Sequence, residues 1–205
     1  MKEDGTYVTK GDLLCEKIIL DYVASVKESY EIVSEEKSVD GFSYDKNKNY
    51  IVIDPIDGTE NFTSGLKEWG VSVSVYVRGV HRESMLLMPE LGLLLLSGDK
   101  IKKNQSRIHA LSSSLGKEHF LNLKDGLEYR IIGCAVYNLY NVITGSFLSL
   151  HNPRGARAWD ILAGLNLARA HGLRVQVNEK KYRGEFLDPR EKYRFKIEHA
   201  HATRR

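Results

Sequence analysis

The sequence predicts a mixed α/β (α+β) fold, and three observations support this. The chain has 205 residues, of which 42% are hydrophobic and 28% charged, a composition typical of a globular domain with one sizeable core. Apolar residues recur at helical spacing between residues 12 and 30. Between residues 71 and 78 they instead alternate with polar residues, as in a half-buried strand.

The first half of the chain is expected to hold one helix and then mostly strands. The apolar spacing predicts an amphipathic helix from Asp12 to about residue 30, capped by Thr9 or by Asp12 itself. A brief β-branched and aromatic run at 49–53 predicts a buried strand that leads directly into an acidic turn. Three further strands form an expected antiparallel meander: 71–78, 80–88 and 91–96.

The second half is expected to alternate between helices and strands. A polar, basic stretch at 100–107 marks the expected boundary between two lobes, 1–103 and 104–205, of a single domain. Residues 198–205 are expected to be a solvated tail. The predicted elements are a strand at 129–132, helices at 135–144 and 160–171, the latter closed by Gly172, and strands around 175–177 and 193–197.

Composition also excludes several classes of protein. Thirty Lys and Arg residues against 27 Asp and Glu give a dispersed net charge of +3, too mild to indicate a nucleic-acid polymer as partner. No apolar run reaches the roughly 20 residues that span a bilayer, and the start resembles no signal peptide. The two cysteines, Cys15 and Cys134, match no zinc or disulfide framework and are expected to be buried thiols. The sequence therefore predicts a cytoplasmic protein with no membrane partner.

The acidic turn after the first strand carries the strongest chemical signal. Asp54 and Asp57 flank Pro55 in the segment Asp54-Pro-Ile-Asp-Gly-Thr59, so their carboxylates can converge, and their repulsion is unfavourable without a cation. Carboxylate oxygens, a backbone carbonyl and water suit Mg²⁺. Gly58 allows close approach of the backbone to a ligand, and the amides that follow it can bind phosphate. An Asx turn with a helix cap is the structural alternative.

Five segments resemble the inositol monophosphatase family of metal-dependent, lithium-sensitive sugar phosphatases, which includes fructose-1,6-bisphosphatase and bisphosphate nucleotidase. The resemblance implies a shortened form of the family's layered sandwich of sheets and helices. In chain order, the segments are Val8-Thr-Lys-Gly-Asp12, Ser34-Glu-Glu36, Asp54-Pro-Ile-Asp-Gly-Thr-Glu-Asn-Phe62, Gly133-Cys-Ala135 and Trp159-Asp-Ile-Leu-Ala-Gly164.

The resemblance also implies roles for individual residues. The phosphate would be held by the amides of Gly58 and Thr59, and Thr59, paired with Asp12, would orient the attacking water with the help of Glu35. Two or three Mg²⁺ ions would be held by Glu35, Asp54, Asp57, Asp160 and the carbonyl of Ile56. The substrate would be contacted by Gly133, Cys134, Ala135 and Arg157.

Some of these assignments have structural alternatives. Asp160 begins a predicted helix and is also a candidate N-cap, as is Asp12 for the first helix. The chemistry alone does not separate Glu35 from Glu36, because neighbouring residues of a strand face opposite ways. Arg157, like Arg154, can bind a second phosphate or be a solvated surface arginine.

The implied activity is Mg²⁺-dependent hydrolysis of a small phosphorylated metabolite, such as an inositol monophosphate or a sugar phosphate, by an enzyme that forms a possible homodimer. Pro153 replaces a Glu that contacts the sugar in inositol-specific relatives, which weakens inositol as the substrate. Fructose 1,6-bisphosphate, a 3′(2′),5′-bisphosphate nucleotide and NADP are alternatives. A catalytically idle relative that only binds a phosphorylated ligand is the alternative of another class.

Overall fold

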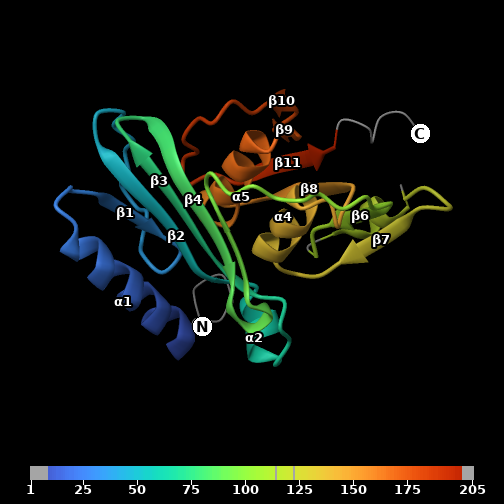
Figure 1. The fold of residues 1–205 in the computed structure, drawn as a ribbon, viewed down its shortest axis with the longest axis horizontal. Helices are drawn as coiled ribbons and strands as arrows, with labels where there is room; N and C mark the ends of the chain where they lie inside the picture. The colour runs from blue at the N-terminus through green and yellow to red at the C-terminus, as the bar shows by residue number, and fades with distance from the viewer. Residues whose placement is uncertain (1–8, 114, 122, 200–205) are drawn as a thin grey trace.

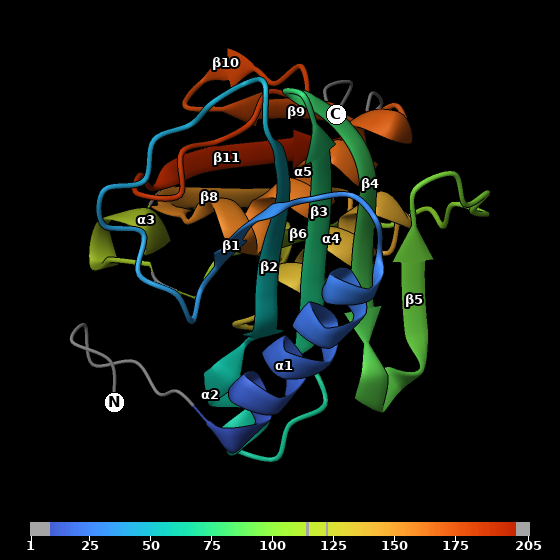
Figure 2. The same cartoon turned by 90° about the vertical axis from the view of Figure 1, so that its left-hand side faces the viewer.

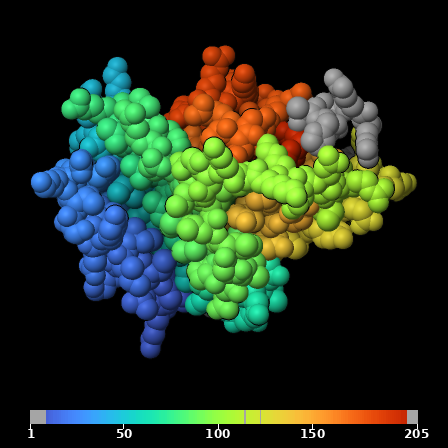
Figure 3. All heavy atoms as spheres, in the orientation of Figure 1, coloured from blue at the N-terminus to red at the C-terminus, as the bar shows by residue number. Residues whose placement is uncertain are grey.

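The computed structural model describes residues 9–113, 115–121 and 123–199 of the chain. Two β-sheets and the helices around them form layers (Figure 1). Helix α1 covers the outer face of the first sheet, and helices α4 and α5 lie between the two sheets (Figures 1 and 2). The predicted α/β sandwich is therefore confirmed. In the space-filling view α1 and strand β7 lie at opposite ends of the molecule (Figure 3).

The first sheet has five strands in the order β1-β2-β3-β4-β5. The predicted antiparallel meander is confirmed for β3 to β5. Strand β2 also pairs with β3 in antiparallel fashion, whereas β1 joins β2 in parallel. Strand β2 is longer than expected, because pairing with β3 resumes at Asp57 after a bulge around Pro55. The strands are β1 (Glu31–Ser34), β2 (Asn49–Asp57), β3 (Gly70–Val77), β4 (Val80–Met88) and β5 (Leu93–Leu96).

The second sheet has six strands in the order β10-β9-β11-β8-β6-β7. Side chains that alternate along β8, β9 and β11, such as Leu150, Val175 and Ile197, are buried in the core between this sheet and the helices α4 and α5. The strands are β6 (Ile108–Leu111), β7 (Glu128–Ile131), β8 (Ser149–Ala156), β9 (Arg174–Val177), β10 (Lys180–Lys181) and β11 (Tyr193–Glu198).

The helices predicted near α4 and α5 form as expected, α1 differs from its prediction, and the short α3 and η1 were not predicted. Helix α1 ends at Ser25 rather than near residue 30, and Leu14, Ile18 and Tyr22 on its apolar stripe are at least 60% exposed. No helix in the described ranges is both long and apolar enough to cross a membrane. The helices are α1 (Lys10–Ser25), α2 (Thr59–Thr63), the 3-10 turn η1 (Pro89–Leu91), α3 (Lys117–Phe120), α4 (Ala135–Ile143) and α5 (Ala158–Ala170).

The prediction of a solvated tail from residue 198 is wrong for its first two residues. Glu198 closes β11, and His199 is buried with its Nε2 atom 2.7 Å from the carbonyl oxygen of Val142. An isolated histidine near a chain end carries no periodic signal, so this contact between distant segments could not be read from the sequence. Residues 200–205 lie outside the described part of the chain.

Candidate active site

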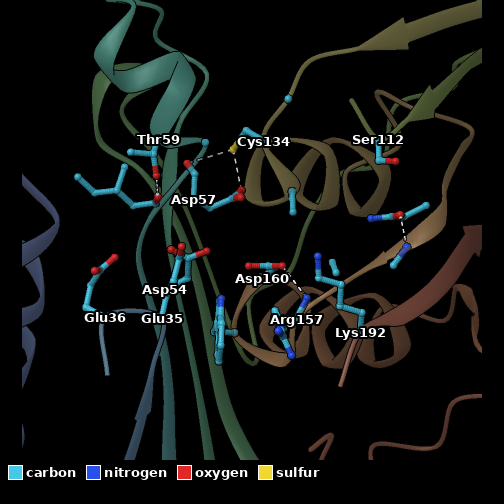
Figure 4. A pocket seen from close by; sticks show the side chains of 18 of the residues that line it. Glu35, Glu36, Asp54, Asp57, Thr59, Ser112, Cys134, Arg157, Asp160 and Lys192 are labelled. Carbon is cyan, nitrogen blue, oxygen red and sulfur yellow. Dashed lines mark hydrogen bonds between the residues drawn. The ribbon is translucent and has the colours of Figure 1, made fainter. Parts of the chain in front are cut away.

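Three acidic side chains from distant parts of the chain converge between the two sheets. Each of Glu35, Asp54 and Asp160 offers one carboxylate oxygen, and these oxygens lie within 4.8 Å of one another. Figure 4 shows Glu35 and Asp54 on the first sheet and Asp160 facing them from α5. The structure therefore brings together three of the predicted metal ligands, and Glu35, rather than Glu36, belongs to the group.

The strand pairing explains why the first two acids meet. Strands β1 and β2 are parallel, with Ser34 opposite Ile53, and the amide of Glu35 donates to the Ile53 carbonyl at 3.2 Å. The residues that follow this pair, Glu35 and Asp54, therefore lie side by side where the parallel pairing of β1 with β2 ends. Asp160 reaches the same point because it lies in the first turn of α5.

The local electrostatics suit a hard cation. Asp54 is 1% exposed, and neither of its carboxylate oxygens has a hydrogen-bond donor among the described residues. Burial, together with the charges of Glu35, Asp57 and Asp160, holds the pKa of Asp54 well above its usual range. A divalent ion would remove this repulsion, and an all-oxygen donor set is the one that Mg²⁺ prefers. The residues present therefore fit a magnesium site.

Asp160 has a structural partner as well as its place in the cluster. Its Oδ2 atom accepts from the backbone N–H of Arg157 at 2.7 Å, as in a capping box at the start of α5. Burial and the charges of Asp57 and Glu35 nevertheless hold the pKa of Asp160 well above its usual range. Arg157, and not Asp160, is the N-cap of α5, so the alternative that Asp160 is the N-cap is wrong. A carboxylate has two oxygens, so the hydrogen bond that closes the capping box is compatible with the place of Asp160 in the cluster.

Asp57 lies beside this cluster and is not one of the three converging acids. Its Oδ2 atom accepts from the Cys134 thiol at 2.9 Å and from the Val136 N–H at 2.5 Å, at the start of α4. Burial raises the pKa of Asp57 to about 6, although these two hydrogen bonds lower it. The expected convergence of Asp54 and Asp57 is thus incomplete, because donors at the amino end of α4 hold one Asp57 oxygen away from the cluster.

The partners of Thr59 and Asp12 differ from the expected pair. The Thr59 hydroxyl donates to the carbonyl oxygen of Ile56 at 3.1 Å. One Asp12 oxygen accepts from the backbone N–H and hydroxyl of Thr9, at 2.7 and 2.6 Å. Thr9 is the N-cap of α1 and Asp12 closes the capping box from the third position of the helix, so the alternative that Asp12 is itself the N-cap is wrong. The other Asp12 oxygen is buried without a hydrogen-bond partner among the described residues. Thr59 and Asp12 do not share a hydrogen bond in the part of the chain that the structure describes.

The Gly58 backbone packs tightly against the opposite wall. Gly58 has a left-handed conformation, with φ of 81°, and a Cβ atom placed on it would lie 2.9 Å from the Cβ of Cys134. Only glycine permits this approach without strain. The turn that carries Thr59 and the segment from Gly133 to Ala135 are therefore in contact, and both line the site.

These residues line one cavity of about 860 Å³ (Figure 4). Its wall includes every predicted site residue except Asp12. It also includes Ser112, Asn138 and Lys192, which the sequence analysis did not identify. No motif marks these three residues, since their position depends on how β6, α4 and the segment before β11 assemble in three dimensions.

Comparisons with known proteins agree with this geometry. The model of the inositol monophosphatase family matches residues 1–113, more than half of the chain. The chain is 27% identical over 196 residues to inositol-1-monophosphatase of Mesorhizobium japonicum and 26% identical over 196 residues to Nus factor SuhB of Pasteurella multocida. Each alignment covers 84% of this chain and 72% of the relative.

Solved structures match along nearly the whole chain. An IMPase/NADP phosphatase complexed with NADP and Ca²⁺ superposes with a TM-score of 0.81 at 20% identity, over 99% of this chain and 82% of the other. A Ca²⁺-bound IMPase family protein from Staphylococcus aureus gives 0.79 at 19% identity, over 97% and 80%. The chain therefore belongs to the inositol monophosphatase family of metal-dependent phosphatases and has its layered α/β fold.

Proposed function

We propose that this protein is a Mg²⁺-dependent phosphomonoesterase that releases phosphate from a small phosphorylated metabolite. The observation that carries the proposal is the convergence of Glu35, Asp54 and Asp160, with both oxygens of the buried Asp54 lacking a donor among the described residues. Such a cluster is unfavourable in a folded protein unless a cation occupies it.

The proposed metal ligands are the three clustered acids, Asp57 and the carbonyl of Ile56, which together would hold two or three Mg²⁺ ions. The second oxygen of Asp57 would bind metal while Cys134 and Val136 hold the first. When bound, the cations would activate water and stabilise the oxygen that departs from phosphorus.

The remaining proposed roles belong to the turn and the opposite wall. The hydroxyl of Thr59 would orient the attacking water, with Asp12 and Glu35 in support, and the amides of Gly58 and Thr59 would hold phosphate oxygens. The unsatisfied Asp12 oxygen supports a second partner for that residue. The substrate would be contacted by Gly133, Cys134, Ala135 and Arg157, all of which line the cavity.

The substrate class remains within small phosphate esters. An inositol monophosphate or sugar phosphate is the leading candidate, and fructose 1,6-bisphosphate, a 3′(2′),5′-bisphosphate nucleotide or NADP is the alternative. The alternative is supported by the cavity of about 860 Å³, which has room beyond one phosphate. Among similar proteins, one structure is named as a complex with NADP and another with D-inositol-1-phosphate.

A phosphate-release panel tests the function. Inositol 1-phosphate, fructose 1,6-bisphosphate, adenosine 3′,5′-bisphosphate and NADP are incubated with the protein in Mg²⁺ or in a chelator. Release that requires Mg²⁺ and disappears in Asp54→Asn is the expected result. Absence of release from every substrate, with calorimetric binding of these ligands intact, would instead identify a catalytically idle ligand-binding protein.

We also propose that the chain is one domain of two lobes, 1–103 and 104–205, that it works in the cytoplasm and that it forms a homodimer. Two free cysteines, Cys15 and Cys134, support a reducing compartment. Exposed apolar side chains on α1, including Leu14 and Ile18, support an interface between copies. Light scattering coupled to gel filtration measures the mass, and a monomer at all concentrations would contradict the homodimer.

A further inference from the structure

Two basic side chains, Arg157 and Lys192, line one side of the cavity. Strand pairing brings them together, because Tyr193 of β11 lies opposite Ala156 of β8. Figure 4 shows both side chains beyond Asp160, on the side of the acidic cluster away from Thr59. We call this pair the Arg157–Lys192 rim.

The Arg157 guanidinium is held in place by contacts from two directions. Its Nη1 group donates to the carbonyl oxygen of Arg190, and its Cζ atom lies 6.0 Å from the centre of the Trp159 ring. Arg190 is itself fixed by Asp188, with 2.6 Å between Nη2 and Oδ2. Arg157 is therefore preorganised at the edge of the cavity, which lowers the entropic cost of binding a ligand there.

Neither charge of the rim is neutralised by a protein carboxylate at salt-bridge distance. No salt bridge within the described ranges includes Arg157 or Lys192. The loop on the other side of the cavity carries the acids Glu36 and Asp40 with the single base Lys37. The potential of the cavity wall is therefore asymmetric, and the rim is the side on which an anion is favoured.

The geometry of phosphoryl transfer relates the rim to one part of the substrate. In the proposed function, Thr59 orients the attacking water on one side of the acidic cluster. In-line displacement places the leaving oxygen on the side of phosphorus opposite the attacking water. The alcohol part of the substrate would then extend past Asp160, toward the Arg157–Lys192 rim (Figure 4).

The neighbouring wall offers polar groups without partners. Asn138 is 3% exposed, and its Oδ1 atom has no hydrogen-bond partner among the described residues. The buried hydroxyl oxygen of Ser112 likewise has none. Both residues line the same cavity as the rim. Buried polar atoms of this kind are costly unless a ligand or water satisfies them, and hydroxyl groups of a sugar or ribose would do so.

We propose that Arg157 and Lys192 bind a second anionic group, carried by the alcohol part of the substrate. This inference rests on the proposed function and narrows its substrate class to phosphate monoesters that carry a further phosphate or carboxylate. The rim thereby determines specificity, since a guanidinium and an ammonium contribute strong charge-assisted hydrogen bonds to such a group.

Two matched nucleotides test the proposal. Adenosine 3′,5′-bisphosphate and adenosine 3′-phosphate offer the same ester to the metal site, and only the first carries a second anion. The quantity compared is the ratio of their kcat/KM values in Mg²⁺. Removal of one charge-assisted bond in Lys192→Met should lower this ratio about tenfold, and Lys192→Arg should restore most of it. Lys180→Met, an exposed lysine of β10 away from the cavity, is the matched control and should leave the ratio unchanged.

A binding measurement distinguishes failure of this proposal from failure of the proposed function. The same two nucleotides are titrated by calorimetry with Ca²⁺ in place of Mg²⁺, so that affinity is read without turnover. Tighter binding of the bisphosphate that is lost in Lys192→Met supports the rim even if no phosphate is released. Equal affinities for both nucleotides, or a preference that Lys192→Met leaves intact, would overturn it. Release of phosphate with no preference would retain the function and reject only the rim.

Discussion

Removal of divalent cations should make the stability of this protein fall as the pH rises through the range in which its site acids ionise. Burial raises the pKa of Asp57 from 3.8 to about 6 in the folded chain. Between these two pH values the folded state keeps a proton that the unfolded state has released. Stability is therefore greatest below about pH 4 for this group and is lost as the pH rises toward and beyond 6.

The size of the effect follows from the shift. A difference of about 2 pH units corresponds to about 3 kcal/mol at pH 7, at 1.36 kcal/mol per unit. Asp54 and Asp160, whose pKa values are raised well above the usual range, add to the effect in the same direction. For a chain of this length, 3 kcal/mol corresponds to a change of about 6–12 °C in Tm.

The assay compares Tm in EDTA and in Mg²⁺ from pH 5 to 7.5. Four histidines with lowered pKa values act in the opposite direction, since folding keeps them neutral and acid destabilises them. These histidines are His81, His109, His151 and His171. Their effect is the same in EDTA and in Mg²⁺, so it cancels in the difference between the two Tm values. We therefore expect the stabilisation by Mg²⁺ to grow by several degrees over this range.

Two variants sharpen the comparison. Asp54→Asn should raise the Tm in EDTA at pH 7.5, because it removes a buried carboxyl group whose ionisation the neighbouring acids disfavour, and should reduce the gain from Mg²⁺. Asp125→Asn, on an exposed loop, is the matched control and should behave as the wild type does. A difference between Mg²⁺ and EDTA that stays constant across pH, or shrinks as the pH rises, would refute the reasoning.

Three further predictions concern single residues. Asp57→Asn should abolish Mg²⁺-dependent phosphate release while the circular dichroism spectrum stays unchanged. Thr59→Ala should lower kcat without changing the Mg²⁺ affinity measured by calorimetry. Equal effects of the two variants on Mg²⁺ affinity would contradict their separate roles. Cys134→Ala should weaken Mg²⁺ binding about tenfold, because Asp57 loses its thiol donor, whereas Cys134→Ser should retain the Mg²⁺ affinity. Equal Mg²⁺ affinities in both variants would show that the thiol does not position Asp57. Gly70→Ala places a Cβ atom 2.5 Å from Val136 Cγ1 and 2.7 Å from the Leu87 carbonyl oxygen. The free energy of unfolding, measured by urea denaturation, should therefore fall by about 2 kcal/mol. An unchanged free energy of unfolding would contradict this and show that the layers can shift.

Much of the fold could be predicted because local pattern and tertiary structure agree. The alternating residues of β3 and the hydrophobic face of α4 are strong periodic signals, and both elements form as expected. The apolar residues of α1 also recur at helical spacing, yet Ile18 and Tyr22 are exposed in the structure. Periodicity reports that a face is apolar and does not report what covers it.

The candidate site was predictable where its residues adjoin element ends and unpredictable where they depend on distant segments. Asp54 directly follows the β-branched run at 49–53, and Asp160 lies in the first turn of a helix, so the sequence marks both residues. The choice of Glu35 over Glu36 depends on the parallel register of β1 and β2, and the orientation of Asp57 depends on donors at the start of α4. Lys192 lies in a loop without a motif and reaches the cavity only through the pairing of β8 with β11.

The most direct test of the account is anomalous diffraction from crystals grown with Mn²⁺, a hard cation that accepts the same oxygen ligands as Mg²⁺. The account predicts an anomalous peak at coordination distance from carboxylate oxygens of Glu35, Asp54 and Asp160. A well-ordered site with these three side chains in place and no peak between them, at saturating Mn²⁺, would contradict it.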